Sequence, residues 1–370
     1  MKERFEVLDV FRGIFASLII LFHLSAFSAT PLINNQFIRN ADLFVDFFFL
    51  LSGFVIAYSY QFITTSADLG KFYKKRFYRL YPLHFVVFIC FVAIEFLKSY
   101  AAQYAHVNKL TNESNNIYTA LTNLFLVNSI KFPGIHDVSW NIASWSISAE
   151  MIAYFVFGVT VMFINRSGLK QVKSFVYGAV VMAAITALYI FTGGLKLVYN
   201  FDFGFLRGIT GFFTGVLCYN TYAKTKQVVS RQSSAVFHIA ETLFIAIIII
   251  SVWYGDQLKP YGLLYEILFF ITILIFAFER GWISHLLKRP AILHQTGKYS
   301  YSIYMTHTMM LSLFNIVFFR VLKFPPSAYA YLFVPNFLLI YWVSSWTFKN
   351  IEMRFNQVPQ HNGKKTWWLW

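Results

Sequence analysis

The chain is short of charged residues and of cysteine. Asp, Glu, Lys and Arg make up only 13% of its 370 residues, roughly half the share of an average soluble protein, and no stretch is polar enough to solvate a separate domain in water. The two cysteines, Cys90 and Cys218, both lie in apolar segments and lack the spacing of metal ligands. The scarcity of charge excludes a soluble globular fold, and the scarcity of cysteine argues against a metal site or a disulfide framework.

Hydrophobic residues dominate the composition. They make up 58% of the chain, and aromatic residues alone make up 21%. Apolar runs long enough to cross about 30 Å of hydrocarbon recur along the chain, and they lack the strict alternation that a membrane β-barrel needs. The sequence therefore predicts an all-α polytopic membrane helix bundle of about ten transmembrane helices, with a single domain over residues 1–355 and a short cytoplasmic tail over 356–370. The runs lie at residues 10–29, 43–63, 81–100, 145–164, 174–192, 205–222, 238–254, 261–279, 299–321 and 330–349.

The basic residues are distributed unevenly between the segments that join these runs. If the N-terminus is cytoplasmic, 21 of the 31 Lys and Arg residues fall in segments on that side and eight fall on the other. Positive charge accumulates on the cytoplasmic side of membrane proteins, so both termini are predicted to be cytoplasmic. The net charge of +15 is then a signal of topology, and no nucleic-acid partner is expected.

The first apolar run contains two ionisable residues, Arg12 and His23. They are eleven residues apart, about three helical turns, so both project from one face roughly 16 Å apart. Ionisable groups that face lipid are costly, and such a pair usually points into a protein interior or a wet cavity with a functional role. The alternative is that Arg12 reaches the lipid headgroups and His23 hydrogen-bonds to a neighbouring helix.

Residues from three other runs are expected at a similar depth. Asp46 and Glu150 approach the level of His23 from the outer ends of the second and fourth helices, and Tyr304 and His307 lie just below in the ninth. A carboxylate beside a histidine holds its tautomer and stabilises its cation, while the other nitrogen takes a proton from a hydroxyl. This predicts His23 as a general base oriented by Glu150 or Asp46. Alternatively, Asp46 caps its helix and Glu150 pairs with a buried tyrosine or histidine.

Three serines near these carboxylates are rival nucleophiles, namely Ser52, Ser146 and Ser148. Ser52 precedes Gly53, and two small residues in a membrane helix are more typical of close helix packing. Both interpretations of Ser52 remain open.

A basic cluster precedes the third apolar run. Arg76 and Arg79 are three residues apart and share a helical face, and three lysines precede them at positions 71, 74 and 75. Arginine forks suit phosphate groups. The cluster is also typical of a cytoplasmic membrane boundary with lipid phosphates as partners, so a ligand phosphate site is one of two interpretations.

One substantial outer loop, residues 101–144, contains an amphipathic pattern. Ile117, Leu121, Leu124 and Phe125 recur at helical spacing, which predicts a helix lying on the membrane. Such a helix either roofs a cavity or packs on the surface.

Five short motifs follow one another along the chain. They are LDVFRG at 8–13 with His23 behind it, FFFLLSGF at 47–54, RFYRLYP at 76–82, SWSISAE at 144–150 and GKYSYSIYMTH at 297–307. In these motifs and their order the chain resembles the integral-membrane acyltransferase family 3. The resemblance implies an enzyme that uses acyl-CoA, most simply acetyl-CoA, as a co-substrate without a tightly bound cofactor, and a carbohydrate as acceptor.

The resemblance also implies roles for particular residues. In this family an arginine pair just before the third helix is thought to meet the nucleotide end of acyl-CoA, which assigns Arg76 and Arg79 to the donor, with Arg12 and Lys298 adding charge to the same site. The catalytic residues are then expected to be His23, Glu150 and Asp46. The residues expected to line the substrate site are Trp145, Ser148, Tyr304 and His307.

The end of the chain also resembles the family. Glu352, near the C-terminus of the tenth predicted helix, resembles the end of the family's sequence. Lys349 and Arg354 lie nearby, and they favour a solvated ion pair with Glu352 on the inner surface. Some members carry a periplasmic hydrolase-like domain after the helices, and none is expected here.

The predicted function is O-acyl transfer in a bacterial inner membrane. Cytoplasmic acyl-CoA and a hydroxyl of a surface or lipid-linked carbohydrate are expected to meet at His23, by direct transfer or through an acyl-enzyme. The rival class is a proton-coupled transporter or flippase of a polysaccharide precursor with His23, Asp46 and Glu150 as a proton relay. The absence of paired broken helices and of two-half symmetry in the sequence argues against it. A membrane scaffold is a third class. Membrane lipid is a partner in each case, and no oligomeric state is predicted.

Overall fold

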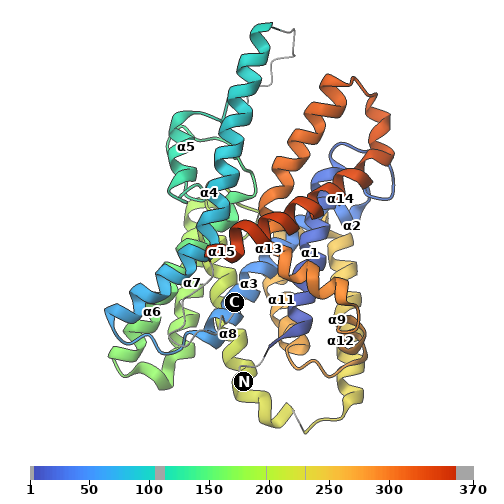
Figure 1. Cartoon of the computed structure of the whole chain (residues 1–370). Helices are drawn as coiled ribbons and strands as arrows, with labels where there is room; N and C mark the ends of the chain where they lie inside the picture. The colour runs from blue at the N-terminus through green and yellow to red at the C-terminus, as the bar shows by residue number, and fades with distance from the viewer. Residues whose placement is uncertain (1–3, 105–112, 197, 230, 356–370) are drawn as a thin grey trace.

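The computed structural model describes residues 4–104, 113–196, 198–229 and 231–355 (Figure 1). The predicted tail at 356–370 lies outside these residues. Within the described part the chain is helical and has no β-strand. The helices are α1 (Glu6–Ser25), α2 (Gln36–Arg39), α3 (Phe44–Ser59), α4 (Ser66–Tyr104), α5 (Ile117–Leu124), α6 (Ser144–Arg166), α7 (Lys173–Thr192), α8 (Gly204–Val229), α9 (Ser234–Trp253), α10 (Gly255–Leu258), α11 (Leu263–Phe276), α12 (Trp282–Leu287), α13 (Ala291–Asn315), α14 (Tyr329–Thr347) and α15 (Met353–Phe355).

The predicted all-α membrane bundle is confirmed. Among the described residues, eight helical stretches are long and apolar enough to cross a membrane, and a ninth results if the two segments around α10 and α11, which meet at 99°, form one span. α8 has the length of a span at 26 residues but a more polar composition. All ten predicted runs coincide with helices, and the side of the membrane that each terminus faces stays a prediction.

The third helix begins earlier than its apolar run. The run was expected to start at residue 81, whereas α4 starts at Ser66 and continues through Pro82. A proline inside a helix removes one backbone hydrogen bond without necessarily ending the helix. Arg76 and Arg79 consequently lie inside α4 rather than in front of it.

The centre of the bundle is the contact between α3 and α8. α8 packs against α3, α6, α7 and α11, and both partners of the α3–α8 contact are largely buried. A methyl group added to Gly53 would lie 1.8 Å from the carbonyl oxygen of Phe212, and one added to Gly215 would lie 1.8 Å from that of Leu50. The two backbones therefore touch directly, which only glycine permits.

A second close contact joins α1 to α13. A methyl group on Gly13 would lie 2.4 Å from the hydroxyl oxygen of Thr296, and one on Gly297 would lie 2.4 Å from the carbonyl oxygen of Asp9. This approach brings the ionisable face of the first helix against the helix that carries the GKYSYSIYMTH motif.

The predicted amphipathic helix in the outer loop is α5. Asn116 and Thr119 form a reciprocal capping box at its start, the device that satisfies two backbone donors at a helix N-terminus. Ile117 is 78% exposed, and the side chains of Leu121 and Phe125 are exposed as well. An exposed apolar face is what a helix lying on a membrane presents.

Replacing Gly53 with alanine is expected to destabilise the protein by at least about 1–3 kcal/mol, because the added carbon overpacks the α3–α8 contact. Gly178 in α7 is the matched control, since a methyl group there meets nothing within 4 Å and alanine is the better helix former by roughly 1 kcal/mol. Thermal unfolding of the detergent-purified variants measures both effects. Equal melting temperatures for Gly53→Ala and Gly178→Ala would contradict the packing described here.

Candidate functional site

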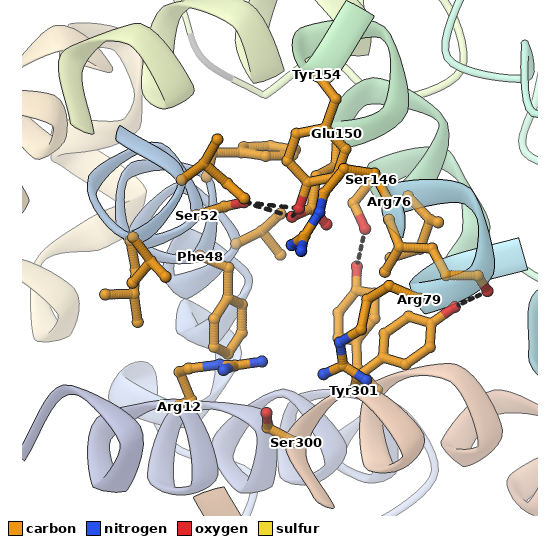
Figure 2. Close-up of a pocket in the computed structure, with 18 residues that line it drawn as sticks. Arg12, Phe48, Ser52, Arg76, Arg79, Ser146, Glu150, Tyr154, Ser300 and Tyr301 are labelled. Atoms are coloured by element: carbon orange, nitrogen blue, oxygen red, sulfur yellow. Dashed lines mark hydrogen bonds between the residues drawn. The ribbon is translucent and has the colours of Figure 1, made fainter. Parts of the chain in front are cut away.

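A cavity opens inside the bundle between α1, α3, α4, α6 and α13 (Figure 2). It encloses about 870 Å³ of atom-free space, counted out to its open mouth. Its wall carries three arginines, which are cationic, and one glutamate, which is acidic. Figure 2 shows the three guanidinium groups converging on the same space. The lining residues are Arg12, Val45, Phe48, Phe49, Leu51, Ser52, Val55, Ile56, Arg76, Arg79, Leu80, Ser146, Ile147, Glu150, Tyr154, Ser300, Tyr301 and Tyr304.

The cavity joins residues that the sequence had placed on separate helices. Arg12 comes from α1, Arg76 and Arg79 come from α4, Glu150 comes from α6 and Tyr304 comes from α13. Cationic groups thus exceed anionic ones on its wall, and arginine forks are well suited to phosphate oxygens. The arrangement can hold an anionic ligand.

Glu150 is the acceptor of a small hydroxyl cluster on the cavity wall. Ser52 Oγ donates a hydrogen bond of 2.5 Å to Glu150 Oε1, and the hydroxyl of Tyr154 donates to the same oxygen. The oxygens of Ser52 and Tyr154 are 3.0 Å apart. Glu150 therefore pairs with a buried tyrosine, one of the two alternatives open from sequence. Tyr154 lies four residues after Glu150, a spacing that places the two side chains together on a helix.

Arg76 is held by aromatic side chains. Its Nη2 donates to the hydroxyl of Tyr60 at 3.2 Å, and its guanidinium carbon lies 5.2 Å from the centre of the Tyr60 ring and 5.9 Å from that of Tyr154. The residue is 5% exposed. Stacking on aromatic rings stabilises a guanidinium and fixes its orientation at the cavity wall.

Arg79 forms a buried ion pair with Glu352, so the expectation of a solvated pair between Glu352 and Lys349 or Arg354 was wrong. Glu352 is 2% exposed, bonds Arg79 Nη1, and accepts a hydrogen bond of 2.9 Å from Ser302 Oγ. The helical path continues from α14 through Phe348–Glu352, which turns this carboxylate toward α4 and α13 instead of the surface. Sequence spacing alone favoured the nearer cations.

His23 and His307 lie beside one another but do not line the cavity. Their ring centres are 4.9 Å apart at an interplanar angle of 43°. His307 is buried, whereas His23 is partly exposed. Tyr304 separates the histidines from the cavity, since it lines the cavity while its ring centre is 5.7 Å from that of His307. Its hydroxyl accepts a hydrogen bond of 2.9 Å from Ser146. Tyr304 thus borders both the cavity and His307.

The predicted pairing of His23 with Asp46 or Glu150 is not formed. Asp46 instead accepts two hydrogen bonds from Arg207, of 2.7 and 2.9 Å, and is 1% exposed. The close α3–α8 contact places Arg207 directly against Asp46, although 161 positions separate them. Arg207 also lies over the ring of Trp145 at 5.2 Å. Asp46 does not cap α3 either, since this helix has no side-chain cap.

Three other predicted residues do not border the cavity. Trp145 is buried against Arg207 and lines a smaller pocket beside the outer loop. Ser148 is fully buried, where its hydroxyl donates to the carbonyl of Leu126 and contacts Ser129 at 2.8 Å. Lys298 is exposed on α13. Ser148 thus fastens the outer loop to α6, and the predicted substrate-lining roles of Trp145 and Ser148 stay predictions.

Removing one member of the Asp46–Arg207 pair is expected to cost about 3–5 kcal/mol, because the partner is left as an uncompensated buried charge. The variants Asp46→Ala and Arg207→Ala, and the double variant, would be compared by thermal unfolding in detergent. The double variant is expected to be less destabilised than the sum of the singles. Additive effects would show that the two side chains do not depend on each other.

Comparisons with known proteins agree with this architecture. Residues 5–345 match the model of the acyltransferase family named Acyl_transf_3, described as an acyltransferase domain. A protein called Protein 2 in picA locus from Rhizobium radiobacter is 37% identical over 100 residues, which cover 26% of this chain and 49% of that protein. Acyltransferase MdmB from Streptomyces mycarofaciens is 32% identical over 114 residues, 30% of this chain and 26% of that protein. The alignments thus span about half of one relative and a quarter of the other.

No solved structure matches the chain significantly. The match over residues 5–345 shows that this multi-pass membrane protein belongs to the acyltransferase 3 family.

Proposed function

We propose that this protein transfers an acetyl or other short acyl group from cytoplasmic acyl-CoA to a hydroxyl of a surface or lipid-linked carbohydrate at a bacterial inner membrane, with His23 as general base. The observation that carries the proposal is the convergence of Arg12, Arg76 and Arg79 on one cavity inside a membrane bundle. Membership in an acyltransferase family favours this reading over a transporter or a scaffold.

The donor proposal rests on charge and shape. Acyl-CoA carries phosphates at its nucleotide end. Its slender pantetheine arm extends from there and ends in the thioester. Arginine forks can bind the phosphates at the mouth, while a wall of Phe48, Val55 and Ile56 accepts the arm. Arg12 is the least enclosed of the three cations, with 21% of its side chain exposed, and it has Asp9 at 3.8 Å.

The chemistry assigned to His23 is proton transfer. The imidazole takes the proton of the acceptor hydroxyl as that oxygen bonds to the thioester carbon. The carbon–sulfur bond then breaks and the proton passes to the departing thiolate. Because Tyr304 lines the cavity and lies against His307, whereas His23 is not among the lining residues, this route requires the Tyr304 side chain to move aside so that a thioester in the cavity reaches His23.

Ser52 supplies the competing route inside the cavity. Its hydroxyl already donates to the Glu150 carboxylate at 2.5 Å, the geometry of a nucleophile beside a base. In this route the acyl group is first carried as an ester on Ser52 and the acceptor attacks it afterwards. The two routes differ in whether the protein carries the acyl group without an acceptor.

The test uses glycan extracted from cells that lack the gene, with the purified protein in liposomes and acetyl-CoA labelled in the acetyl group. Transfer of label to the glycan is expected with the wild type and is expected to fall by about 10²–10⁴-fold in His23→Ala. A wild type that transfers no label, together with unchanged glycan esters in the deletion strain, would contradict the proposed function. Label that stays on the protein without acceptor, and is lost in Ser52→Ala, would assign the competing route.

Arg12→Gln and Arg76→Gln are each expected to raise the KM for acetyl-CoA by roughly 10–100-fold, the value of a hydrogen bond to a charged group. Arg166→Gln is the matched control, because Arg166 is exposed outside the cavity and bonds the carbonyl of Thr64. The KM values come from the same liposome assay. An unchanged KM in both cavity variants would refute the donor assignment.

A further inference from the structure

His307 has one ring nitrogen whose role the structure fixes. Its Nδ1 lies 2.6 Å from the carbonyl oxygen of Tyr304, and a carbonyl can only accept, so Nδ1 carries the proton. In a neutral imidazole the other nitrogen then holds a lone pair. That nitrogen, Nε2, is buried and makes no hydrogen bond among the described residues. A buried acceptor left without a donor is costly and calls for an explanation.

Among the described residues, His23 is the imidazole in contact with His307, and its ring can supply the missing donor. The ring centres of His23 and His307 are 4.9 Å apart at an interplanar angle of 43°, so the two imidazoles are in contact, but no hydrogen bond joins them as the side chains are placed. The carboxylates nearest in depth have other partners among the described residues: Asp46 is bound to Arg207, Glu150 to Ser52 and Tyr154, and Asp42, whose charge acts on His23, to Lys259.

The helix around His307 is held rigidly by an asparagine from the outer loop. Thr308 Oγ1 donates to Asn141 Oδ1 at 2.7 Å, and Asn141 Nδ2 donates to the carbonyl oxygen of Met305 at 3.2 Å. On the other side, Thr306 Oγ1 and Ser344 Oγ are 2.9 Å apart. Because the helix is fixed on both sides of His307, the His307 side chain can hold a neighbouring side chain in one orientation.

We propose that His307 is the positioning residue for His23, and that its Nε2 accepts the N–H of the His23 ring when that ring turns toward it from the contact seen here. This rests on the proposed function. The bond fixes the tautomer of His23, so that its second nitrogen carries the lone pair that faces the acceptor hydroxyl. A histidine thereby takes the orienting place that an aspartate holds in a Ser-His-Asp triad.

The proton balance follows from this arrangement. The hydroxyl proton moves to the free nitrogen of His23 as the acceptor oxygen bonds to the acyl carbon, and His23 becomes an imidazolium. His307 remains neutral and accepts the same hydrogen bond, now from a cation and therefore stronger. When the carbon–sulfur bond breaks, the proton passes from His23 to the thiolate of CoA, and both histidines return to their starting forms.

The experiment compares His307→Leu with His307→Gln in the liposome assay. Leucine removes the acceptor, whereas the glutamine carboxamide can place an acceptor near the position of Nε2. His307→Leu is expected to lower kcat by between about tenfold and 10⁴-fold with an unchanged KM for acetyl-CoA, and His307→Gln is expected to recover part of the loss. His84→Leu is the matched control, since His84 is equally buried and also bonds a main-chain carbonyl, that of Asn123 at 2.9 Å.

The outcomes separate this proposal from the proposed function. If the wild type is active, three results would overturn the positioning role alone. They are a His307→Leu variant as active as the wild type, His307→Leu and His307→Gln variants that are equally impaired, and a His84→Leu variant that loses as much kcat as His307→Leu. An inactive wild type would instead overturn the proposed function. If His307→Leu does not fold, His307→Gly assayed with and without added imidazole makes the same test, and rescue of kcat by imidazole is the expected result.

Discussion

Two backbones in direct contact hold the centre of this molecule together. Gly53 on α3 and Gly215 on α8 leave no room for side chains between the helices, and van der Waals contact of this kind drives helix association in membranes, where the hydrophobic effect between helices is weak. The contact sets the relative register of the two helices. Asp46 meets Arg207 because of that register, and the wall of the cavity on the α3 side follows from it.

The charged residues of the interior are satisfied by partners that are remote in sequence. Asp46 is paired with Arg207 and Arg79 with Glu352, while Glu150 accepts hydrogen bonds from two hydroxyls. An ion in a membrane protein is costly unless it is paired or reaches water. His23 and His307 lie apart from these pairs, next to Tyr304, and no carboxylate among the described residues hydrogen-bonds either ring. The bundle thus separates the charged wall of the cavity from the pair of imidazoles.

Hydropathy and motif order predicted the fold well, because each spanning helix is encoded by its own residues. The ten apolar runs are helical, and Arg12, Arg76, Arg79, Glu150 and Tyr304 do line one cavity. Which side chains pair within the bundle depended on helix neighbours that no local pattern encodes. Depth placed Asp46, Glu150 and His23 at one level, but depth does not say on which face of the bundle a residue lies. The Arg207 and Glu352 pairings, 161 and 273 positions away from their partners, were therefore missed.

The position of Glu352 in the chain has a consequence for biogenesis. Arg79 is inserted into the membrane 273 residues before the carboxylate that neutralises it, so the nascent bundle carries an uncompensated cation until translation reaches the last helix. The ion pair on the α4 side of the cavity is completed only then. A partly synthesised chain therefore lacks the ion pair that holds Arg79 on the wall of this cavity.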